Sequence, residues 1–422
     1  MMRTSIYLSR FPAFFLCVAF PLYLAIRGSA SLSDIALLCS SLSERAEALH
    51  IKLTSWLAAS PAPISKTSLN PLAEPATGSP EGGIRKTYQP LPDGLAHCIN
   101  SFEQYSLLAE QGLQRKHARY SRQNPAQKTI SNKLGYPAHF EKTRKGIEVN
   151  ARFSEKIALI GREDYHTGSR ALEDREDAEF GLVDLAFGHL LRDWSSQGAG
   201  ERKAVFPPIL DRLDQHFDGN GRGNKVLVPG SGMGRLASDI ADLGYDVTAN
   251  ELDYGSILAY HLLTNHTHSL HQHTLQPFVT KWAHQANPSS RYSPLTVPDH
   301  WPNKAVQLIE GDFLEVFPRD GEFDAVVTLF FIDMSDNVID FLSNIHRLLK
   351  PGGVWINLGP LKWGSYSALH LSAEEVLQLA VLLGFDVDHT SRKSIDSLYA
   401  EQPETLLKFT YVTQFWSATK RG

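Results

Sequence analysis

The stretch that decides the fold of this chain is KVLVPGSGMGRL, residues 225–236. A short apolar run breaks into three glycines at alternate positions, and apolar residues then recur at helical spacing through residue 243. This pattern predicts a strand, a tight turn and a helix. Because glycine adopts positive φ and leaves backbone N–H groups accessible at the start of the helix, the turn is suited to hold a small ligand.

The nature of that ligand depends on the glycine spacing and on the next acidic residue. Gly230, Gly232 and Gly234 give G-x-G-x-G, whereas the dinucleotide fingerprint is G-x-G-x-x-G. A second predicted strand at residues 245–250 ends at Glu251, whose carboxylate can accept hydrogen bonds from both ribose hydroxyls of an adenosine. NAD and S-adenosylmethionine (SAM) both carry that ribose, so these residues do not choose between them. The alternative is a structural turn followed by a solvated strand end.

Composition and charge exclude some classes of site and partner. The chain has 422 residues, 42% of them hydrophobic, which is enough for two ordinary domains with unstructured extensions. Its net charge of −5 gives no electrostatic reason to expect nucleic acid as a partner. No cysteine follows Cys98, so the later region has neither a disulfide nor a thiolate metal site. Four clustered histidines at residues 266–273 fit no zinc spacing, so we predict no metal site.

The predicted domain order begins with a hydrophobic N-terminal segment at residues 1–30. Its apolar run at residues 11–26 resembles a signal peptide or a short membrane anchor. A wrongly assigned start codon, an extension docked on the domain and a mitochondrial presequence are the alternatives. Residues 31–96 are predicted to be a disordered linker, because they include a stretch rich in proline, serine and glycine. A helical region at residues 97–205 and an α/β domain at residues 206–422 follow.

Strand and helix patterns alternate through the C-terminal domain. A helix at residues 252–265 is followed by an irregular insertion at residues 266–301, which we place on the ligand side of the sheet. The next strand ends in Gly-Asp-Phe, so Asp312 can accept a hydrogen bond from an adenine amino group while Phe313 packs on its ring. A near-continuous apolar strand, typical of a sheet buried on both faces, then ends at Asp333.

The order of the last elements narrows the fold class. A helix at residues 337–349, the turn KPGG at residues 350–353 and a strand at residues 354–358 form a junction that is frequent in SAM-dependent methyltransferases. A helix at residues 372–383 precedes two strands, at residues 385–390 and 408–416. Two strands without a crossover between them predict an antiparallel hairpin at the sheet edge.

Several segments together resemble the carnosine N-methyltransferase family, and the likeness runs from about residue 98 to the end. They are VPGSGMGRL at 228–236, NE at 250–251, GDF at 311–313, FFID at 330–333, NVID at 337–340 and WINLGPL at 355–361, with RDWS at 192–195 and ER at 201–202 upstream. The resemblance implies an α/β class I SAM-dependent methyltransferase fold. This is a Rossmann-like seven-stranded sheet preceded by a helical region, with residues 206–422 as the SAM-binding domain.

The resemblance also implies which residues bind the cofactor and the methyl acceptor. On spacing alone Arg192 is a solvated cation at the end of a helix at residues 177–196, whereas the resemblance implies that it binds the SAM carboxylate. Tyr411 is a core aromatic by its pattern alone, but the resemblance implies that it and Asp333 are catalytic. The implied cofactor-binding residues are Arg192, Gly230, Gly232, Gly234, Glu251, Asp312, Phe313 and Leu329.

Enzymes of this family transfer the methyl group of SAM to an imidazole nitrogen of carnosine, giving anserine. Asp333 can accept the other ring N–H and fix the tautomer, or it can bind the ammonium group of the dipeptide. This chain departs from the family at Gly364, where a substrate-contacting histidine is expected, and at Phe409, where a tyrosine is expected. A positive φ at Gly364 would exclude any side chain there, and His370 is the nearest histidine that could substitute.

The acceptor, the partners and the compartment follow from the same resemblance. A protein-histidine methyltransferase, a methyltransferase for another small amine and a non-enzymatic SAM-fold scaffold are the alternative functions. We expect a small imidazole-containing peptide as substrate, no nucleic acid, membrane contact through residues 11–26 if that segment is an anchor, and a homodimer as one candidate assembly. The family implies the cytosol, with the nucleus as a second compartment, whereas the N-terminal segment implies the secretory pathway or a membrane.

Overall fold

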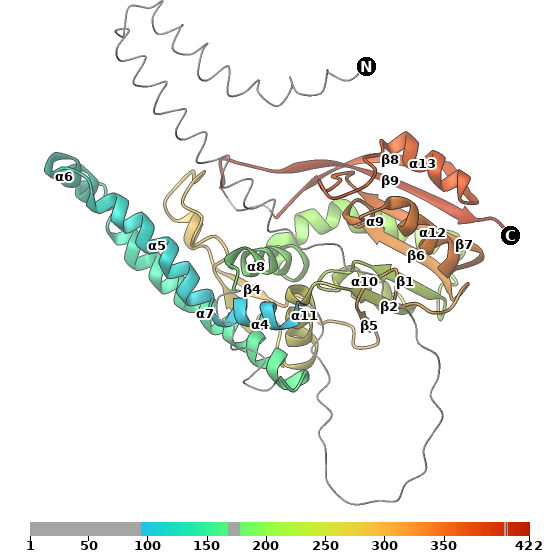
Figure 1. Ribbon diagram of the computed structural model, residues 1–422, viewed down its shortest axis with the longest axis horizontal. Helices are drawn as coiled ribbons and strands as arrows, with labels where there is room; N and C mark the ends of the chain where they lie inside the picture. Colours follow the sequence, from blue (N-terminus) through green and yellow to red (C-terminus); the bar gives the residue numbers. More distant parts are fainter. Residues whose placement is uncertain (1–93, 168–177, 401, 403) are drawn as a thin grey trace, which may run out of the picture. The chain divides into compact units, whose positions relative to one another are not determined.

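The computed structural model describes residues 94–167, 178–400, 402 and 404–422 (Figure 1). The predicted segment at residues 1–30 and the predicted linker up to residue 93 lie outside the described residues. Within the described residues, no helix combines the length and the apolar character needed to cross a membrane.

The described chain is helical from residue 95 to residue 216, except at residues 168–177, which are not described, and in short connections. The helices are α4 (Leu95–Glu103), α5 (Tyr105–Ser121), α6 (Pro125–Lys133), α7 (Ala138–Asp164), α8 (Phe180–Trp194) and α9 (Ala199–His216). A capping box between Asn124 and Gln127, with Pro125 at the first helical position, starts α6. In Figure 1, α5, α6 and the start of α7 project away from the sheet.

A seven-stranded sheet is at the centre of the C-terminal region, with the order β5-β2-β1-β6-β7-β9-β8. Its strands are β1 (Lys225–Pro229), β2 (Asp246–Glu251), β5 (Gln307–Glu310), β6 (Phe323–Leu329), β7 (Leu349–Gly359), β8 (Phe385–Leu398) and β9 (Thr410–Lys420). The strands from β5 to β7 are parallel, while β9 runs antiparallel to both β7 and β8. The predicted fold class and the predicted C-terminal hairpin are confirmed.

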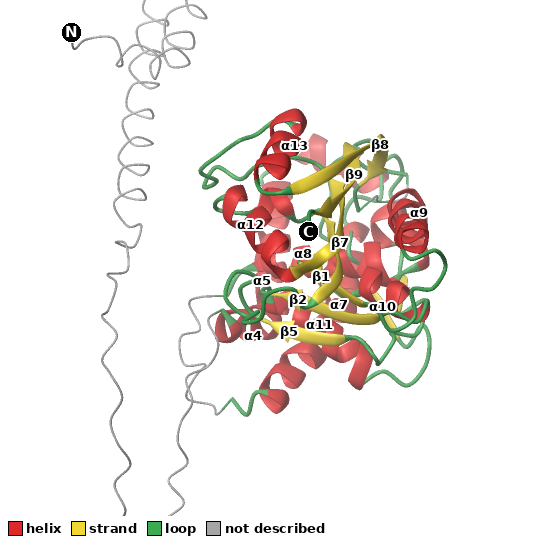
Figure 2. Cartoon of the chain, turned by 90° about the vertical axis from the view of Figure 1, so that its right-hand side faces the viewer, coloured by secondary structure: helices red, strands yellow, loops and turns green. Residues whose placement is uncertain are grey.

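Helices cover both faces of this sheet (Figure 2). On one face, α9 and α10 (Arg235–Asp242) bury side chains such as Ile209 and Ile240 against Val226 of β1. On the other face, α12 (Val338–Leu348) and α13 (Ala373–Leu382) pack against Trp355 of β7. The helix α11 (Tyr254–Asn265) instead shares a core with α4, α7 and α8. The strand that follows β1 in the chain, β2, lies on one side of β1, whereas β6 lies on its other side. The strand order therefore reverses at β1, and open α/β sheets bind ligands in the crevice at such a point.

Three parts of the prediction differ from the structure in extent. The hairpin strands are longer than predicted, because polar residues such as Ser394 and Asp396 in β8 hide the strand pattern. The turn KPGG is included in β7, which begins at Leu349. The insertion at residues 266–301 contains a small antiparallel pair, β3 (His273–Leu275) and β4 (Leu295–Val297), and these strands contact α7 and α8.

Candidate functional site

The glycine loop lies where the predicted turn between β1 and α10 was placed. Gly230, Gly232 and Gly234 have φ values of 58°, 55° and 74°, all in the left-handed region. A side chain at Gly230 would overlap the ring of Phe331, and a Cβ at Gly234 would lie 2.7 Å from the ring of Tyr260. Only glycine fits both the backbone conformation and the packing at these two positions.

The Glu251 carboxylate is bound to this loop. One of its oxygens accepts the N–H of Gly232 at 2.7 Å, and the other accepts the N–H groups of Leu252 at 2.8 Å and Asp253 at 2.9 Å. Burial raises the pKa of the Glu251 carboxyl above its usual range, although the three N–H donors oppose this shift. The parallel pairing of β1 with β2 therefore brings the predicted acid beside the predicted glycines.

The end of β5 lies beside the end of β2. The Asn250 side chain donates hydrogen bonds to the carbonyl oxygens of Ile309 at 3.0 Å and Gly311 at 2.9 Å, which ties the two strand ends together. An Asp312 oxygen accepts the N–H of Leu314 at 2.8 Å. The Phe313 ring is 4% exposed and packs edge-on against Phe331 in the core. The ring is therefore part of the core, and its contact with an adenine stays a prediction.

The chain is strained where β6 ends. Leu329 is the last residue of this strand, and Phe330 follows it with a φ of 53°, which is rare for a bulky residue. Its N–H donates to the carbonyl oxygen of Leu358 at 2.9 Å. A Cβ at Gly359 would lie 3.1 Å from the Phe330 backbone nitrogen, so glycine permits this close approach. Strained residues of this kind cluster at functional sites.

Asp333 lies beyond this strained residue, in a 3-10 turn at residues 332–334 and not at the end of the strand as predicted, and it is 4% exposed. One of its oxygens accepts the backbone N–H of Lys362 at 2.8 Å, which links the end of β6 to the loop after β7. Burial raises the pKa of the Asp333 carboxyl, and the hydrogen bond from Lys362 opposes this shift. A buried carboxylate with one oxygen engaged retains lone pairs for a further donor.

Arg192 is not the solvated helix-end cation that spacing alone predicts. Its side chain is 13% exposed, and its Nε donates to Glu201 at 2.6 Å. The guanidinium carbon lies 4.2 Å from the ring centroid of Tyr399 and 5.3 Å from that of Phe330. The desolvation that burial imposes is outweighed by Glu201 and other anions, so the pKa of Arg192 is raised.

Tyr411 belongs to the same cluster as Arg192. Its ring centroid is 5.9 Å from that of Phe330 and 5.6 Å from that of Tyr399, edge-on in both cases. The structure thus brings the predicted Arg192 and Tyr411 together around Phe330. Tyr399 was missed by the sequence reasoning, because only the pairing of β8 with β9 shows that it lies beside Tyr411.

Asp193 is a second residue that the sequence reasoning missed. A Cβ built on Gly232 would lie 3.8 Å from an Asp193 carboxylate oxygen, so this acid faces the glycine loop. Burial raises the pKa of Asp193 to about 6, against the opposing effect of Arg192. Its neighbour Trp194 is fully buried and donates its indole N–H to the carbonyl oxygen of Met233 at 2.8 Å. The end of α8 is therefore fixed against the loop.

The segment around Gly364 shows what stands in place of the expected histidine. Gly364 is outside the left-handed region, so the positive φ considered from the sequence is not present. A side chain at Gly364 would overlap the ring of Tyr366, which is 55% exposed. The Nε2 of His370 lies 3.1 Å from the Gly364 carbonyl oxygen, where its N–H can donate. The nearest histidine of the sequence is therefore next to Gly364 in space as well.

A group with metal-like spacing among the described residues is Asp239, Asp242 and His300. Asp239 is paired with Arg235 at 2.8 Å, and Asp242 contacts His300 at 3.0 Å, so each of the two carboxylates has a partner within the chain. Of the clustered histidines, His273 is buried and lies 2.9 Å from the Thr267 hydroxyl.

Comparisons of the sequence with known proteins point to one family. The family model described as carnosine N-methyltransferase matches residues 172–422. A carnosine N-methyltransferase of Drosophila melanogaster is 33% identical over 244 residues, which cover 55% of this chain and 53% of the fly protein. The mouse carnosine N-methyltransferase is 26% identical over 364 residues, covering 82% and 89%. The match to the fly protein thus spans about half of that relative's length.

Other comparisons extend this set. A carnosine N-methyltransferase of Schizosaccharomyces pombe is 30% identical, with 56% of this chain and 69% of that protein covered. A solved N1-methyltransferase of Burkholderia thailandensis, with bound S-adenosylhomocysteine, is 17% identical and superposes with a TM-score of 0.33, covering 57% of this chain and 88% of that one. Because the family model accounts for more than half of its residues, this chain belongs to the carnosine N-methyltransferase family.

Proposed function

We propose that this protein is a SAM-dependent methyltransferase that methylates an imidazole nitrogen of carnosine or a related histidine-containing dipeptide, giving anserine from carnosine. The observation that carries the proposal is the arrangement of Glu251 and Asp333 in a member of this family. The Glu251 carboxylate contacts the glycine loop, and Asp333 lies in the turn that follows β6, which is the neighbour of β1 in the sheet. The two acids are thus positioned for separate tasks at one edge of the sheet.

The residues around the glycine loop fit SAM. Glu251 is at the end of β2, where a carboxylate can accept hydrogen bonds from ribose hydroxyls. A Cβ on Gly232 would meet only an oxygen of Asp193, at 3.8 Å, so the loop is open on that side. The Nε of Arg192 is engaged by Glu201, so its terminal nitrogens would bind the amino-acid carboxylate. Asp312 would accept from the adenine, with Leu329 and the backbone at Phe313 beside it.

Asp333 acts on the acceptor in this proposal. SAM, when bound, supplies an electrophilic methyl group on a sulfonium sulfur, and the nucleophile is a neutral ring nitrogen of the acceptor. Imidazole has a reference pKa of about 6.5, so the neutral form predominates above that pH. By accepting the N–H of the other ring nitrogen, Asp333 orients the ring and takes up positive charge that develops on it. Its raised pKa makes it a better proton acceptor than an ordinary aspartate.

A second candidate acceptor is a histidine within a protein. Gly364 has no side chain to contact a dipeptide, and the exposed Tyr366 ring stands over it. An exposed aromatic ring at this position suits contact with a longer, peptide-like substrate. If carnosine is the acceptor, His370 is the residue that we expect to supply the missing contact.

One assay distinguishes these functions. Full-length protein is incubated with SAM labelled in its methyl group, together with carnosine, free histidine, a histidine-containing peptide or no acceptor. Label transfer to carnosine, at a single ring nitrogen identified by NMR, is the expected result. Transfer only to the peptide would mean that the acceptor is a histidine in a protein and not a dipeptide. The absence of SAM binding would favour a non-enzymatic scaffold with the same fold. The homodimer, membrane contact through residues 11–26 and the cytosolic or nuclear compartment remain predictions of the family resemblance.

A further inference from the structure

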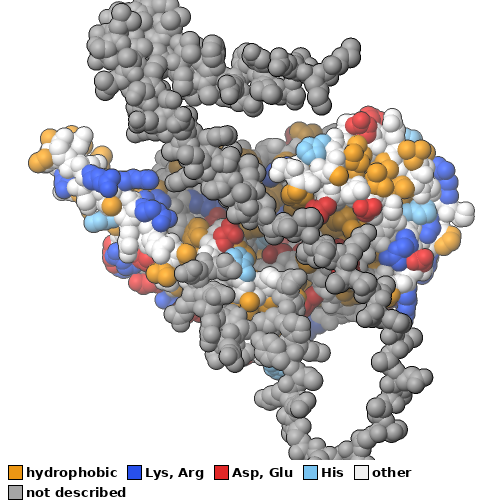
Figure 3. Space-filling model, viewed as in Figure 1, with side chains coloured by type: hydrophobic (Ala, Val, Ile, Leu, Met, Phe, Trp, Pro, Cys, Tyr) orange, Lys and Arg blue, Asp and Glu red, His pale blue; other side chains and the backbone are white. Residues whose placement is uncertain are grey.

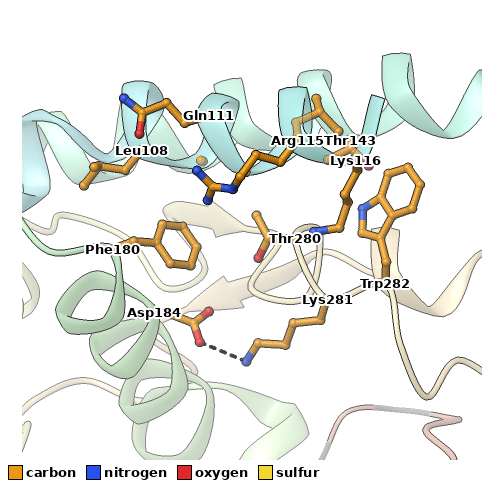
Figure 4. A pocket seen from close by; sticks show the side chains of 13 residues that line it. Leu108, Gln111, Arg115, Lys116, Thr143, Phe180, Asp184, Thr280, Lys281 and Trp282 are labelled. Carbon is orange, nitrogen blue, oxygen red and sulfur yellow. Dashed lines mark ion pairs between the residues drawn. The ribbon is translucent and has the colours of Figure 1, made fainter. Parts of the chain in front are cut away.

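A cavity of about 350 Å³ lies at the opposite end of α8 from Arg192 (Figure 4). Phe180 and Asp184 of α8 line it, and Asp184 is separated from Arg192 by about 12 Å of helix at 1.5 Å per residue. The other walls are α5, α7 and the segment that ends at Trp282. None of the residues proposed to bind SAM or the acceptor lines this cavity. Its volume is in the range of small-molecule pockets.

The cavity combines apolar walls with positive charge that its own residues do not neutralise. Arg115 and Lys116 reach from α5 toward the loop that carries Lys281 (Figure 4). Lys281 is paired with Asp184 at 3.3 Å, whereas Arg115 and Lys116 form no ion pair with any residue that the structure describes. Figure 3 shows Lys and Arg side chains gathered where α5, α6 and the start of α7 project from the rest of the structure.

Buried polar groups around Trp282 also lack partners. Within the described part of the chain, the Trp282 indole N–H has no hydrogen-bond acceptor, and neither does Nε of Arg291. Arg291 is 8% exposed, lies 4.9 Å from the Trp282 ring centroid and has no carboxylate partner among the described residues. Buried donors of this kind are normally paired, and Trp282 lines both cavities.

The pKa of Lys116 is lowered by burial and by the excess of positive charge around it, which comes from the neighbouring Arg115, Arg119 and Arg291. Arg119 lines an adjoining cavity of about 300 Å³ together with Lys116 and Trp282. Arg115 and Lys116 line the first cavity, Lys116 and Arg119 line the second, and Trp282 lines both, so an anion would offset the mutual repulsion of these cations.

We infer that this cavity binds a small organic anion, with its apolar body against Phe180, Leu113 and Trp282 and its carboxylate, sulfonate or phosphate group on Arg115 and Lys116. Simple inorganic anions would leave the apolar walls in water, and neutral apolar molecules would leave the cations unpaired. The combination of both surfaces therefore selects an amphipathic anion. The inference is independent of the methyl acceptor, because no residue of the proposed active site takes part.

The test uses the full-length protein and anilinonaphthalene sulfonate, an aromatic anion that fluoresces when bound in an apolar site. Phenylnaphthylamine has a similar aromatic body without the charged group and is the matched neutral probe. Both are titrated in the presence of saturating S-adenosylhomocysteine. We expect the anion to bind with one-to-one stoichiometry and at least about tenfold more tightly than the neutral probe, the scale of a charged hydrogen bond.

Variants locate the binding. Lys116→Met keeps the aliphatic stem and removes the charge, and together with Arg115→Gln it should weaken the sulfonate at least about tenfold. Lys133→Met, an identical exchange at an exposed position of α6 outside both cavities, should have no effect. Trp282→Phe removes the indole N–H, keeps an aromatic ring in the wall and provides a second test if the double variant does not fold. Unchanged sulfonate affinity in the folded variants, or equal affinity for both probes, would overturn the inference.

Discussion

The Glu251 side chain connects two parts of the structure that a ligand would contact together. Its carboxylate accepts N–H groups from Gly232 in the loop and from Leu252 and Asp253 after β2. Replacing this acid therefore removes a proposed ribose contact and also changes how the loop is held. A neutral residue of the same shape separates these effects better than alanine does.

We expect Glu251→Gln to weaken SAM binding by about 1 to 3 kcal/mol, the cost of losing a charged hydrogen bond. Isothermal titration calorimetry with S-adenosylhomocysteine measures the change. Asp246→Asn is the matched control, because Asp246 is exposed at the other end of the same strand. Unchanged affinity for S-adenosylhomocysteine in Glu251→Gln would contradict the placement of the ribose.

Asp333→Asn should lower kcat/KM by at least about a hundredfold while SAM affinity stays the same, because an uncharged amide does not take up the positive charge of the ring. Asp336→Asn, three residues further along and exposed, should leave the rate unchanged. A parallel loss of S-adenosylhomocysteine affinity in Asp333→Asn would place this acid in the cofactor site.

Stability should respond to Asp333 in the opposite sense to activity. Burial raises the pKa of Asp333 in the folded protein. The wild type should therefore lose stability as the pH rises from the ordinary aspartate pKa of about 3.9 to the raised value. Asp333→Asn does not titrate, so its stability relative to the wild type should rise across that pH interval. Urea unfolding at several pH values measures this, and a variant that becomes relatively less stable as the pH rises would refute the assignment.

At the scale of elements, Glu201 joins α8, α9 and the end of β8. One of its oxygens accepts from Arg192 at 2.6 Å, and the other accepts the N–H of Ala400 at 3.0 Å. The carboxylate is 7% exposed, so the ion pair with Arg192 is buried. Its removal would leave Arg192 as an uncompensated buried cation beside Tyr399.

Glu201→Ala should therefore lower the free energy of unfolding by about 3 to 5 kcal/mol. The exposed pair of Arg392 with Glu374 has a similar N···O distance of 2.6 Å, so Glu374→Ala is the control and should cost less than about 1 kcal/mol. Denaturant unfolding of both variants gives the comparison. Equal costs would mean that solvent reaches the Arg192 pair as freely as the surface pair.

At the scale of the whole molecule, the sequence predicted those elements whose signal is local. The apolar strand β1, the start of β6 and the glycine turn were placed correctly, because their patterns need no partner to be recognised, whereas β6 ends at Leu329 and not at Asp333. Helix α9 was missed, since Pro207 and Pro208 lie inside it. The contact of Glu201 with Ala400 joins residues 199 positions apart. Such contacts, like the ring of Phe313 in the core, depend on packing that no short pattern records.

Ligand binding should stabilise the whole folded domain by mass action. S-adenosylhomocysteine at a hundred times its Kd should add about 2.7 kcal/mol to the free energy of unfolding. For a domain of this size, that corresponds to a rise in Tm of about 5 °C. Differential scanning calorimetry measures the shift, and Glu251→Gln should reduce it at the same ligand concentration. An unchanged Tm in the wild type would argue against cofactor binding.

The contact between Trp194 and the glycine loop should allow ligand binding to be followed by intrinsic tryptophan fluorescence. The indole is fully buried, donates to the Met233 carbonyl oxygen, and has the Arg235 guanidinium 5.0 Å from its ring centroid. A ligand that shifts the loop therefore changes the electric field at the chromophore, so its emission should change with occupancy. The signal should disappear in Trp194→Phe and persist in Trp301→Phe, where the lost indole was 47% exposed. Cofactor dissociation could then be followed in a stopped-flow instrument without any attached dye.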